Sequence, residues 1–463
     1  MSSSSHGAPA VALDRSLVDK YDTAGPRYTS YPTAAEFHAG VGPEEVRRRL
    51  GRADAPLSLY IHIPFCATVC YYCACNKVIT ANRQRAADYL PRLEAEVRRT
   101  AALCGPGRVV EQLHWGGGTP TYLDDDQIRA LMGTLRRHYD LAGEDRGEFS
   151  IEVDPRSLGP ETLAVLREVG FNRLSMGVQD LDPRVQEAVN RIQPAELTAG
   201  ALAEARRLGF RSVSLDLIYG LPLQTVAGFE ATLRAVIEMG PDRLSIFNYA
   251  HLPQRFKVQR QIRAEDLPSP EDKLTILARA IEMLQEAGYR YIGMDHFAKA
   301  EDELARALAD GSLQRNFQGY STHAQCDLVG LGASSISMLD DCYAQNAHGL
   351  DDYYGRIDAG ELATVRGVVL SADDRLRRDV IMDLMCRFRV AAADIEARHG
   401  ISFAEYFAAE LARLAPMAED GLVELDTAGI RVTPAGRLLI RNIAMVFDAY
   451  RQGAPVQGFS KVI

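Results

Sequence analysis

Short runs of β-branched and aromatic residues alternate with longer stretches of helical spacing from residue 56 onward, and this rhythm restricts the fold more than any other feature. The helical stretches include residues 88–100 and 126–138. Such alternation is typical of α/β proteins, in which a helix returns the chain to begin a strand parallel to the one before. The sequence therefore predicts an α/β fold built on a parallel sheet.

Six of the runs have the composition of strands. They begin at Leu57, Val110, Phe149, Arg173, Ser212 and Arg243. Six repeated strand-and-helix units predict a barrel or a partial barrel. A further run, YRYIGMDHFA from Tyr289, is compatible with an extension of the sheet or with the start of an elaboration, and both interpretations stay open.

Composition divides the chain into four parts. Residues 1–13, rich in Ser and Ala, are expected to be a disordered tail. Residues 14–55 form an N-terminal arm with the irregular segment YDTAGPRYTSYP, and residues 56–365 hold the barrel and its elaborations. Residues 366–463 have the pattern of helices, two short strands (GLVELD and GIRVT) and a final helix over TPAGRLLIRNIAMVFDAY. This order predicts a C-terminal helical, winged-helix-like domain that serves as scaffold or lid.

Overall charge excludes some classes of function. The 463 residues carry a net charge of -10, which does not suggest a nucleic-acid-binding protein, and an anionic substrate would need a locally basic pocket. No apolar run approaches the roughly 18 residues of a membrane span, and the first residues lack the pattern of a signal peptide. We expect a cytoplasmic protein that acts as a monomer.

Four of the eight cysteines lie close together, directly after the first predicted strand. Cys66, Cys70, Cys73 and Cys75 have the spacing C-x3-C-x2-C-x-C. Thiolates suit both zinc and iron-sulfur clusters, but a structural zinc site usually joins two ligand pairs, and no second Cys/His pair completes one here. Three cysteines on one loop can instead bind three irons of a cubane and leave the fourth iron open. This spacing resembles the signature of the radical S-adenosylmethionine (radical SAM) superfamily, in which the cofactor chelates that open iron.

Polar residues follow or occupy the same predicted strands, near the edge where parallel barrels place their chemistry. Gly116 to Thr119 follow the second strand, where missing side chains would let backbone N–H groups approach a ligand, although a plain tight turn has the same composition. Glu152 and Asp216 lie on central strands, where a buried carboxylate needs a partner. That partner is either S-adenosylmethionine or an arginine such as Arg173 or Arg191.

Longer stretches are similar to the oxygen-independent coproporphyrinogen III oxidase (dehydrogenase) family of bacterial haem synthesis. The matching segments are YDTAGPRYTSYPTA, YIHIPFCATVCYYCACNK, LHWGGGTPTYL, IEVDPR, RLSMGVQD, DLIYGLP, FNYAHLP, YIGMDHFAKA, NFQGYST, GLGASSIS and TPAGRLLIRNI. They extend from Tyr21 to the C-terminal region. The resemblance implies a partial (β/α)6 barrel of radical-SAM type, a C-terminal helical domain, one [4Fe-4S] cluster and two molecules of S-adenosylmethionine.

The resemblance also implies roles for single residues. Cys66, Cys70 and Cys73 are the implied cluster ligands, and Cys75 is a non-ligating cysteine that we place among the catalytic candidates without a defined role. Implied contacts to the first S-adenosylmethionine are Tyr60, Tyr72, Gly117 and Glu152. Implied contacts to the second are Gly118, Thr119, Gln179, Arg191, Asp216, Ala250 and Ile336. Tyr72 departs from the Phe of the family but keeps an aromatic face.

The implied reaction is the oxygen-independent decarboxylation of two propionates of coproporphyrinogen III to vinyls, which gives protoporphyrinogen IX. It implies a reductase or flavodoxin-type electron donor and an electron acceptor that the sequence does not identify. Four basic residues are candidates for binding the substrate carboxylates, because Arg grips a carboxylate through two hydrogen bonds. They are Arg27, Lys77, Arg83 and Arg315, and a solvated surface charge is the alternative for each.

The alternative function is that of a radical-SAM-like haem chaperone, which binds and transfers haem without decarboxylation. Cys75 and the segment GPRYTSYP argue against it, because both are associated with the oxidase branch. The same segment is expected either to cover the mouth of the barrel or to strap the outside of the domain.

Overall fold

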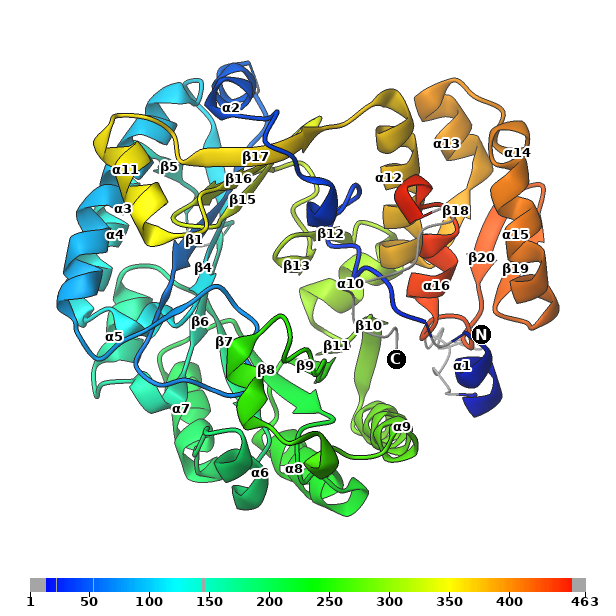
Figure 1. Cartoon of the computed structure of the whole chain (residues 1–463), viewed down its shortest axis with the longest axis horizontal. Helices are drawn as coiled ribbons and strands as arrows, with labels where there is room; N and C mark the ends of the chain where they lie inside the picture. Colours follow the sequence, from blue (N-terminus) through cyan, green and yellow to red (C-terminus); the bar gives the residue numbers. More distant parts are fainter. Residues whose placement is uncertain (1–13, 22, 53, 144–145, 452–463) are drawn as a thin grey trace, which may run out of the picture.

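The computed structural model describes residues 14–21, 23–52, 54–143 and 146–451, so the tail expected at residues 1–13 lies outside the described residues. The six predicted strands are present and run parallel, side by side, in one curved sheet (Figure 1). They are β1 (Leu57–Ile63), β4 (Val109–Gly117), β6 (Glu148–Val153), β7 (Arg173–Gln179), β8 (Ser212–Tyr219) and β9 (Arg243–Asn248). The predicted α/β fold with a partial parallel barrel is confirmed.

Helices cover the outer face of this sheet (Figure 1). They are α3 (Gln84–Leu103), α4 (Asp125–His138), α5 (Thr162–Glu168), α6 (Pro183–Ala188), α7 (Ala195–Arg207), α8 (Val226–Met239) and α9 (Pro270–Glu286). Local sequence explains their ends. Asp124 accepts a hydrogen bond from the Gln127 backbone at 2.8 Å and begins α4, while Gly240 adopts a left-handed φ of 70° and ends α8.

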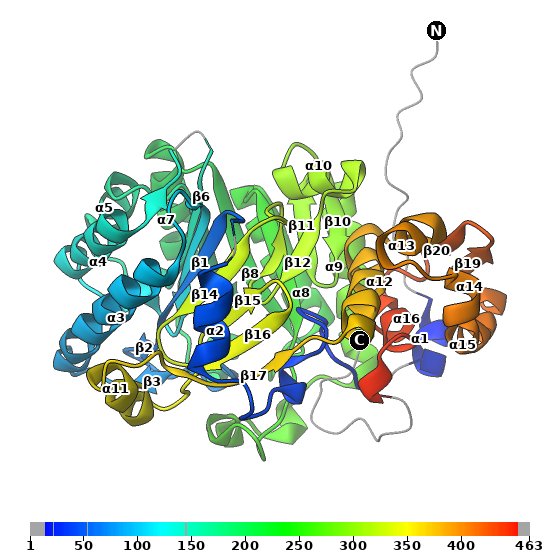
Figure 2. The same cartoon turned by 90° about the horizontal axis from the view of Figure 1, so that it is seen from above.

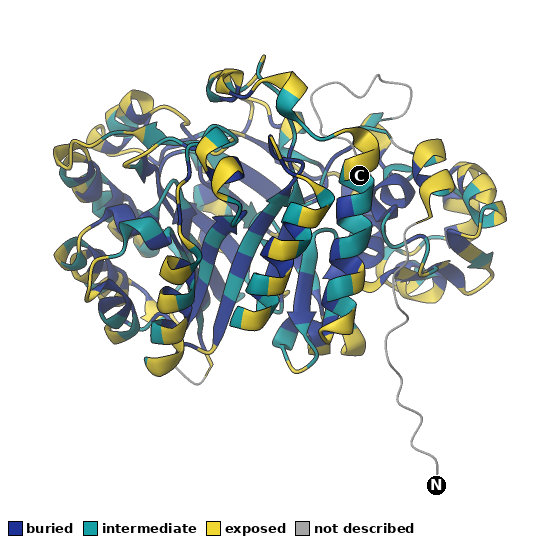
Figure 3. Cartoon of the chain, turned by 90° about the horizontal axis from the view of Figure 1, so that it is seen from below, coloured by how far each residue is buried: buried dark blue, intermediate teal, exposed yellow. Residues whose placement is uncertain are grey.

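Side chains of the strands alternate between an apolar outer face and a polar lumen. In β1, Leu57, Leu59, Ile61 and Ile63 are fully buried, whereas the residues between them point to the opposite face. Inside the barrel Ser58 donates to Gln112 at 2.8 Å, and Gln112 donates to Glu148 at 3.0 Å. In Figure 3 the strands are mainly dark blue and teal, the colours of buried and intermediate residues, and the exposed residues in yellow lie mainly on the outer helices and loops. The lumen is therefore lined by polar groups, which suits a polar ligand better than the aliphatic filling of many barrels.

The sheet extends at both ends beyond the six strands. Past β9, the antiparallel pair β11 (His296–Lys299) and β10 (Tyr289–Gly293) continues it, so the run from Tyr289 is an extension of the sheet. On the other side β1 pairs in parallel with β14 (Asp327–Leu331). Three antiparallel strands follow: β15 (Ile336–Leu339), β16 (Cys342–Asn346) and β17 (Thr364–Val369). The expected domain boundary at residue 366 falls inside β17, which pairs with β16 in the main sheet.

Shorter elements complete the barrel and the arm. They are α1 (Arg15–Tyr21), α2 (Pro43–Leu50), β2 (Phe65–Cys66), β3 (Val78–Ile79), β5 (Asp140–Leu141), α10 (Glu303–Asp310), β12 (Gln314–Asn316), β13 (Gly319–Ser321) and α11 (Leu350–Asp358). Within the described residues, no helix combines the length and the apolar character needed to cross a membrane.

The C-terminal domain lies beside the barrel (Figure 2). Its helices are α12 (Ala372–Arg387), α13 (Ala392–His399), α14 (Phe403–Tyr406), α15 (Ala408–Glu419) and α16 (Ile440–Met445). The two expected strands are β19 (Val423–Asp426) and β20 (Gly429–Val432), and an unexpected third strand, β18 (Arg389–Ala391), pairs with β20. The continuous final helix predicted from residue 433 is wrong, because only α16 and a 3-10 turn at Ala449–Arg451 are helical there.

The N-terminal arm runs between the C-terminal domain and the barrel. Tyr28 donates to Asp448 at 2.8 Å, and the buried Arg441 donates to the carbonyl of Pro26 at 2.9 Å. On the barrel side Arg27 forms an ion pair with Asp295, in the turn between β10 and β11. The arm therefore lies between the C-terminal domain and the barrel and contacts both. This position differs from the predicted alternative in which the arm straps the outer surface of the barrel domain.

A buried carboxylate on α3 joins that helix to the second half of the sheet. Glu96 accepts hydrogen bonds from the Gly332 backbone, the Asn346 amide and the Tyr353 hydroxyl, each at 2.7 Å. Glu96 is more than 230 residues away from all three donors along the chain. Glu96 therefore fastens the connections that follow β14 and β16 to a helix of the barrel.

Replacing Glu96 with Gln should destabilise the protein, because the amide would direct a donor at groups that are themselves donors. We expect the free energy of unfolding to fall by about 1–3 kcal/mol, measured by denaturant unfolding. Glu94→Gln, on the same helix, is the matched control and should change the free energy of unfolding by less than about 0.5 kcal/mol. Equal unfolding midpoints for the two variants would contradict this role of Glu96.

Candidate active site

The three-cysteine loop leaves the C-terminal end of β1 and is fixed mainly by backbone contacts. The short parallel pair β2 and β3 brackets it, with Cys66 opposite Ile79. The Tyr71 backbone donates to the carbonyl of Val189 at 2.9 Å, and the Asn190 side chain donates to that of Val69 at 2.7 Å. The loop is therefore held against the turn that follows α6.

Hydrogen-bond donors surround two of the cysteine sulfurs. Thr119 donates to Cys66 Sγ at 3.4 Å, while Arg156 and Arg191 donate to Cys70 Sγ at 3.5 and 3.7 Å. Hydrogen bonds to the sulfurs stabilise thiolate ligands and tune an iron-sulfur cluster. The sequence analysis missed Arg156, although it stands in the segment IEVDPR, because its distance from the cysteines along the chain conceals their contact.

The cysteine thiols differ in their environment. Burial raises the pKa of Cys66 to about 11, so a metal bound there must displace a proton. A hydrogen bond from Cys75, together with the positive charge of Lys77, lowers the pKa of Cys73 to about 6. Within the described residues, the three sulfurs of Cys66, Cys70 and Cys73 are not gathered within 4.8 Å, as one ion would require.

Gly117, the last residue of β4, and Gly118, which follows it, allow close packing at this strand end. A Cβ atom on Gly118 would lie 2.8 Å from the Pro64 carbonyl, and Gly117 has a φ of 118° that disfavours side chains. The Gly117 N–H donates to Glu152 at 3.2 Å, and the Gly118 N–H donates to Ile63 at 2.9 Å. In this structure protein oxygens accept the hydrogen bonds of both N–H groups, and the contact of these two glycines with a ligand stays a prediction.

Glu152 lies at the lumen beside aromatic rings. Its Oε1 atom is 3.3 Å from His114 Nε2, and the Tyr60 ring stacks on His114 with centroids 5.8 Å apart. In the described parts of the chain the ion-pair partners of Arg173 are Glu148 and Glu303. Among the described ion pairs, Glu152 contacts His114, and the alternative prediction of a salt bridge between Glu152 and an arginine is wrong.

Gln179 at the end of β7, Asp216 within β8 and Arg191 after α6 all lie close to Gly177. Asp216 accepts from Ser175 at 3.2 Å, and burial raises its pKa to about 6. Arg191 donates to the Gly177 carbonyl at 2.6 Å and pairs with Asp154 at 3.2 Å. Gln179 adopts a φ of 69°, and its buried Oε1 atom has no hydrogen-bond partner among the described residues. This acceptor fits a donor that the protein itself does not supply.

The remaining candidates occupy the surrounding wall. Tyr72 packs in an apolar cluster with Val189 and Tyr249. Ala250 follows β9 and is half-buried, and Ile336 begins β15. Cys75 is exposed on the loop. Tyr72 and Cys75 thus follow β1 on the cysteine loop and Ala250 follows β9, while the contacts of these residues with a cofactor stay a prediction.

The four basic candidates separate into two pairs. Arg27 lies over the Phe247 ring and Arg315 lies over the Tyr320 ring, and both rings contact His296. Burial and the charges of Arg441 and Arg315 lower the pKa of Arg27 to about 9. Arg315 is 5% exposed, and its Nε and Nη1 atoms lack hydrogen-bond partners within the described residues. Lys77 instead donates to the Cys73 carbonyl at 3.1 Å, and the guanidinium of Arg83 lies 4.1 Å from the centre of the Tyr122 ring.

The comparisons with known proteins agree with this geometry. A model of the radical SAM superfamily matches residues 60–236, and a HemN C-terminal domain model matches residues 370–439. The oxygen-independent coproporphyrinogen III oxidases of Pseudomonas aeruginosa and Escherichia coli are 54% and 53% identical, over 98% of this chain and 99% of each relative. The solved structure of coproporphyrinogen III oxidase (HemN) from Escherichia coli, described as a radical SAM enzyme, matches with a TM-score of 0.92 at 51% identity, over 96% of this chain and 100% of that chain. This chain therefore belongs to the radical SAM superfamily and, within it, to the family of oxygen-independent coproporphyrinogen III oxidases.

Proposed function

We propose that this chain is a radical SAM oxidoreductase that converts two propionates of coproporphyrinogen III to vinyls without oxygen and so forms protoporphyrinogen IX. The observation that carries this proposal is the three-cysteine loop at one end of a polar barrel, with unpartnered polar atoms on Gln179 and Arg315. Cys66, Cys70 and Cys73 would hold a [4Fe-4S] cluster, as the superfamily implies. Coproporphyrinogen III is the substrate that the names of the relatives indicate.

When bound, the cluster and S-adenosylmethionine would supply a 5'-deoxyadenosyl radical for hydrogen abstraction from a propionate, whose conversion to a vinyl releases carbon dioxide and one electron to the outside acceptor. The protein contributes placement and charge. Thr119, Arg156 and Arg191 donate to the cysteine sulfurs and stabilise their thiolate forms. Tyr72 offers an aromatic face beside the loop, and Cys75 stays a catalytic candidate next to Cys73.

Two molecules of S-adenosylmethionine are part of the proposal. Tyr60, Tyr72, Gly117 and Glu152 would contact the first. Gly118, Thr119, Gln179, Arg191, Asp216, Ala250 and Ile336 would contact the second. The side chains support hydrogen bonding to ribose hydroxyls and an ammonium group, because Glu152 and Asp216 are carboxylates without an arginine partner among the described ion pairs. The unpartnered oxygen of Gln179 is a further acceptor.

The substrate is a tetracarboxylate, and Arg27 and Arg315 are proposed to bind its carboxylates. Arg27 already pairs with Asp295, whereas two nitrogens of Arg315 have no hydrogen-bond partner among the described residues. A substrate carboxylate beside Arg315 would relieve the repulsion between the two guanidinium groups. The oxidation also needs an electron donor of reductase or flavodoxin type and an outside electron acceptor. We further propose that the protein acts as a cytoplasmic monomer.

The first prediction concerns the reaction itself. Anaerobically reconstituted protein, given dithionite, S-adenosylmethionine, coproporphyrinogen III and an electron acceptor, should yield protoporphyrinogen IX and 5'-deoxyadenosine, measured by liquid chromatography and mass spectrometry. Cys66→Ser should lose both products and the bound iron, because it removes a cluster ligand. Cys104→Ser, at the end of α3, should retain both. An intact cluster with unchanged substrate and tight haem binding would favour the haem-chaperone function instead.

The second prediction concerns the number of S-adenosylmethionine molecules. Equilibrium dialysis of the holoenzyme should find two per chain. Gln179→Ala should raise the Kd of one of the two S-adenosylmethionine molecules by about 5-fold or more. It removes an acceptor that has no hydrogen-bond partner within the described residues. Gln254→Ala, at an exposed position, should leave both unchanged. A single bound molecule in the unaltered protein would refute the second site.

The third prediction concerns the substrate carboxylates. Arg315→Gln should raise the KM for coproporphyrinogen III by about 10-fold or more, because a charged donor to a carboxylate is lost. Iron content should stay the same, since Arg315 does not contact the cysteine loop. Arg83→Gln is the matched control, because its guanidinium stacks on Tyr122, and it should leave the KM unchanged. If both variants behave alike, Arg315 does not bind the substrate.

A further inference from the structure

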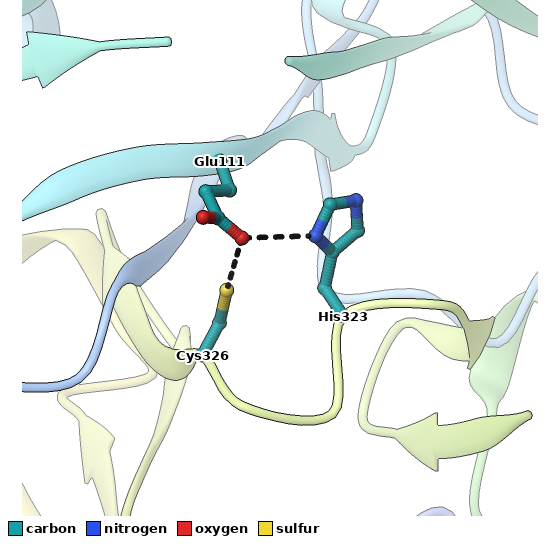
Figure 4. Close-up of side chains that lie close together, drawn as sticks. All are labelled: Glu111, His323 and Cys326. Carbon is teal, nitrogen blue, oxygen red and sulfur yellow. Dashed lines mark hydrogen bonds and ion pairs between the residues drawn. The ribbon is translucent and has the colours of Figure 1, made fainter. Parts of the chain in front are cut away.

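Three potential metal ligands meet at the end of the barrel opposite the cysteine loop. Glu111 stands near the beginning of β4, whereas His323 and Cys326 lie in the connection between β13 and β14. Figure 4 shows the three side chains directed at one another from these two segments. Because the C-terminal ends of β1 and β4 hold the cysteine loop, this cluster is separated from it by the length of the strands.

The distances within the cluster match a single small metal ion. Glu111 Oε2 lies 3.5 Å from His323 Nδ1 and 3.9 Å from Cys326 Sγ, and all three ligand atoms lie within 4.8 Å of one another. Tetrahedral zinc, with bonds of about 2.0–2.3 Å, places its ligand atoms about 3.3–3.6 Å apart. The two distances from Glu111 therefore exceed this spacing by no more than about 0.6 Å, and the third pair of ligand atoms lies within 4.8 Å.

The hydrogen bonding of the cluster is incomplete as it stands. Cys326 makes only a long contact to Glu111, and the buried His323 Nδ1 has no hydrogen-bond partner among the described residues despite its nearness to that carboxylate. A buried ring nitrogen without a partner is costly. Its lone pair would be satisfied by a metal ion at the centre of the cluster.

Two neighbouring side chains contact the ligand residues in the way that groups around a metal site commonly do. Gln325 donates to Glu111 Oε2 at 2.8 Å, which orients the carboxylate. His323 Nε2 faces Glu148 Oε2 at 4.0 Å, so a carboxylate stands behind the ring nitrogen that does not point at the cluster. Such second contacts fix the orientation of a metal-binding imidazole.

We propose that Glu111, His323 and Cys326 bind one zinc ion, with water in the fourth position. Thiolate, imidazole and carboxylate are all ligands that zinc accepts. His323 and Cys326 also line a pocket of about 830 Å³, from which water can reach the site. The Cys326 thiol loses its proton to the solvent on binding.

The position of the site indicates a stabilising role. Both β4 and β14 pair with β1, one on each side. An ion that joins Glu111 of β4 to Cys326, directly before β14, would clip these two strands together across β1. The iron-sulfur loop lies at the other end of the strands, so the zinc would not take part in the radical chemistry.

The test uses the holoenzyme with its iron-sulfur cluster assembled, so that the loop cysteines are occupied. After anaerobic dialysis against zinc and then against buffer, zinc and iron are counted together by mass spectrometry. Cys326→Ser and His323→Ala should each retain one zinc fewer per chain than the unaltered protein, with equal iron. The matched controls Cys104→Ser and His138→Ala should retain as much zinc as the unaltered protein.

Zinc X-ray absorption identifies where the metal sits. The expected spectrum shows one sulfur at about 2.3 Å and nitrogen or oxygen at about 2.0 Å. A zinc content that is the same in all five proteins would overturn the proposal. So would a spectrum with three sulfurs, which would place the zinc on the cysteine loop. Glu111→Gln should also lose the zinc. Because Gln has nearly the same shape as Glu, a folding defect would not explain that loss.

Discussion

The parallel pairing of β1 with β4 on one side and β14 on the other determines where the rest of the molecule lies. In this pairing Tyr60 stands opposite His114 and Gly330, and His62 stands opposite Gly116. Parallel strands in aligned register bring their C-terminal ends to one edge, so the cysteine loop, the glycines after β4 and the polar ends of β6 to β8 meet there. The contact of Thr119, which follows β4, with Cys66, which follows β1, depends directly on this register.

Burial of polar groups has a free-energy cost that the barrel meets in two ways. Some polar side chains in the lumen form hydrogen bonds with one another, as in the chain from Ser58 through Gln112 to Glu148. A few atoms are not, among them Gln179 Oε1 and two nitrogens of Arg315. Buried polar atoms without partners destabilise a protein unless a ligand satisfies them. These atoms therefore mark where the cofactor and the substrate are proposed to bind.

Several features could be predicted from local sequence because their physical cause is local. The six parallel strands begin within a residue or so of their predicted starts, since alternation and β-branched composition act over a few residues. The cysteine loop was identified from spacing alone. By contrast, β14 to β17 were not predicted as strands of the same sheet, because the group joins the sheet only through the pairing of β14 with β1, which spans more than 250 residues. The final helix was overpredicted, because apolar spacing alone cannot show where turns interrupt it.

The sequence by itself determined the α/β class, the cluster-binding loop and, through a resemblance over nearly the whole chain, the family. Only the tertiary structure decided which polar side chains meet. Arg156 reaches Cys70, Glu96 fastens the end of β14, and Glu111 meets His323 and Cys326 across segments far apart in the chain. The physical reason is that spacing along a chain reports local geometry, whereas contacts between distant segments depend on the register and curvature of the assembled sheet.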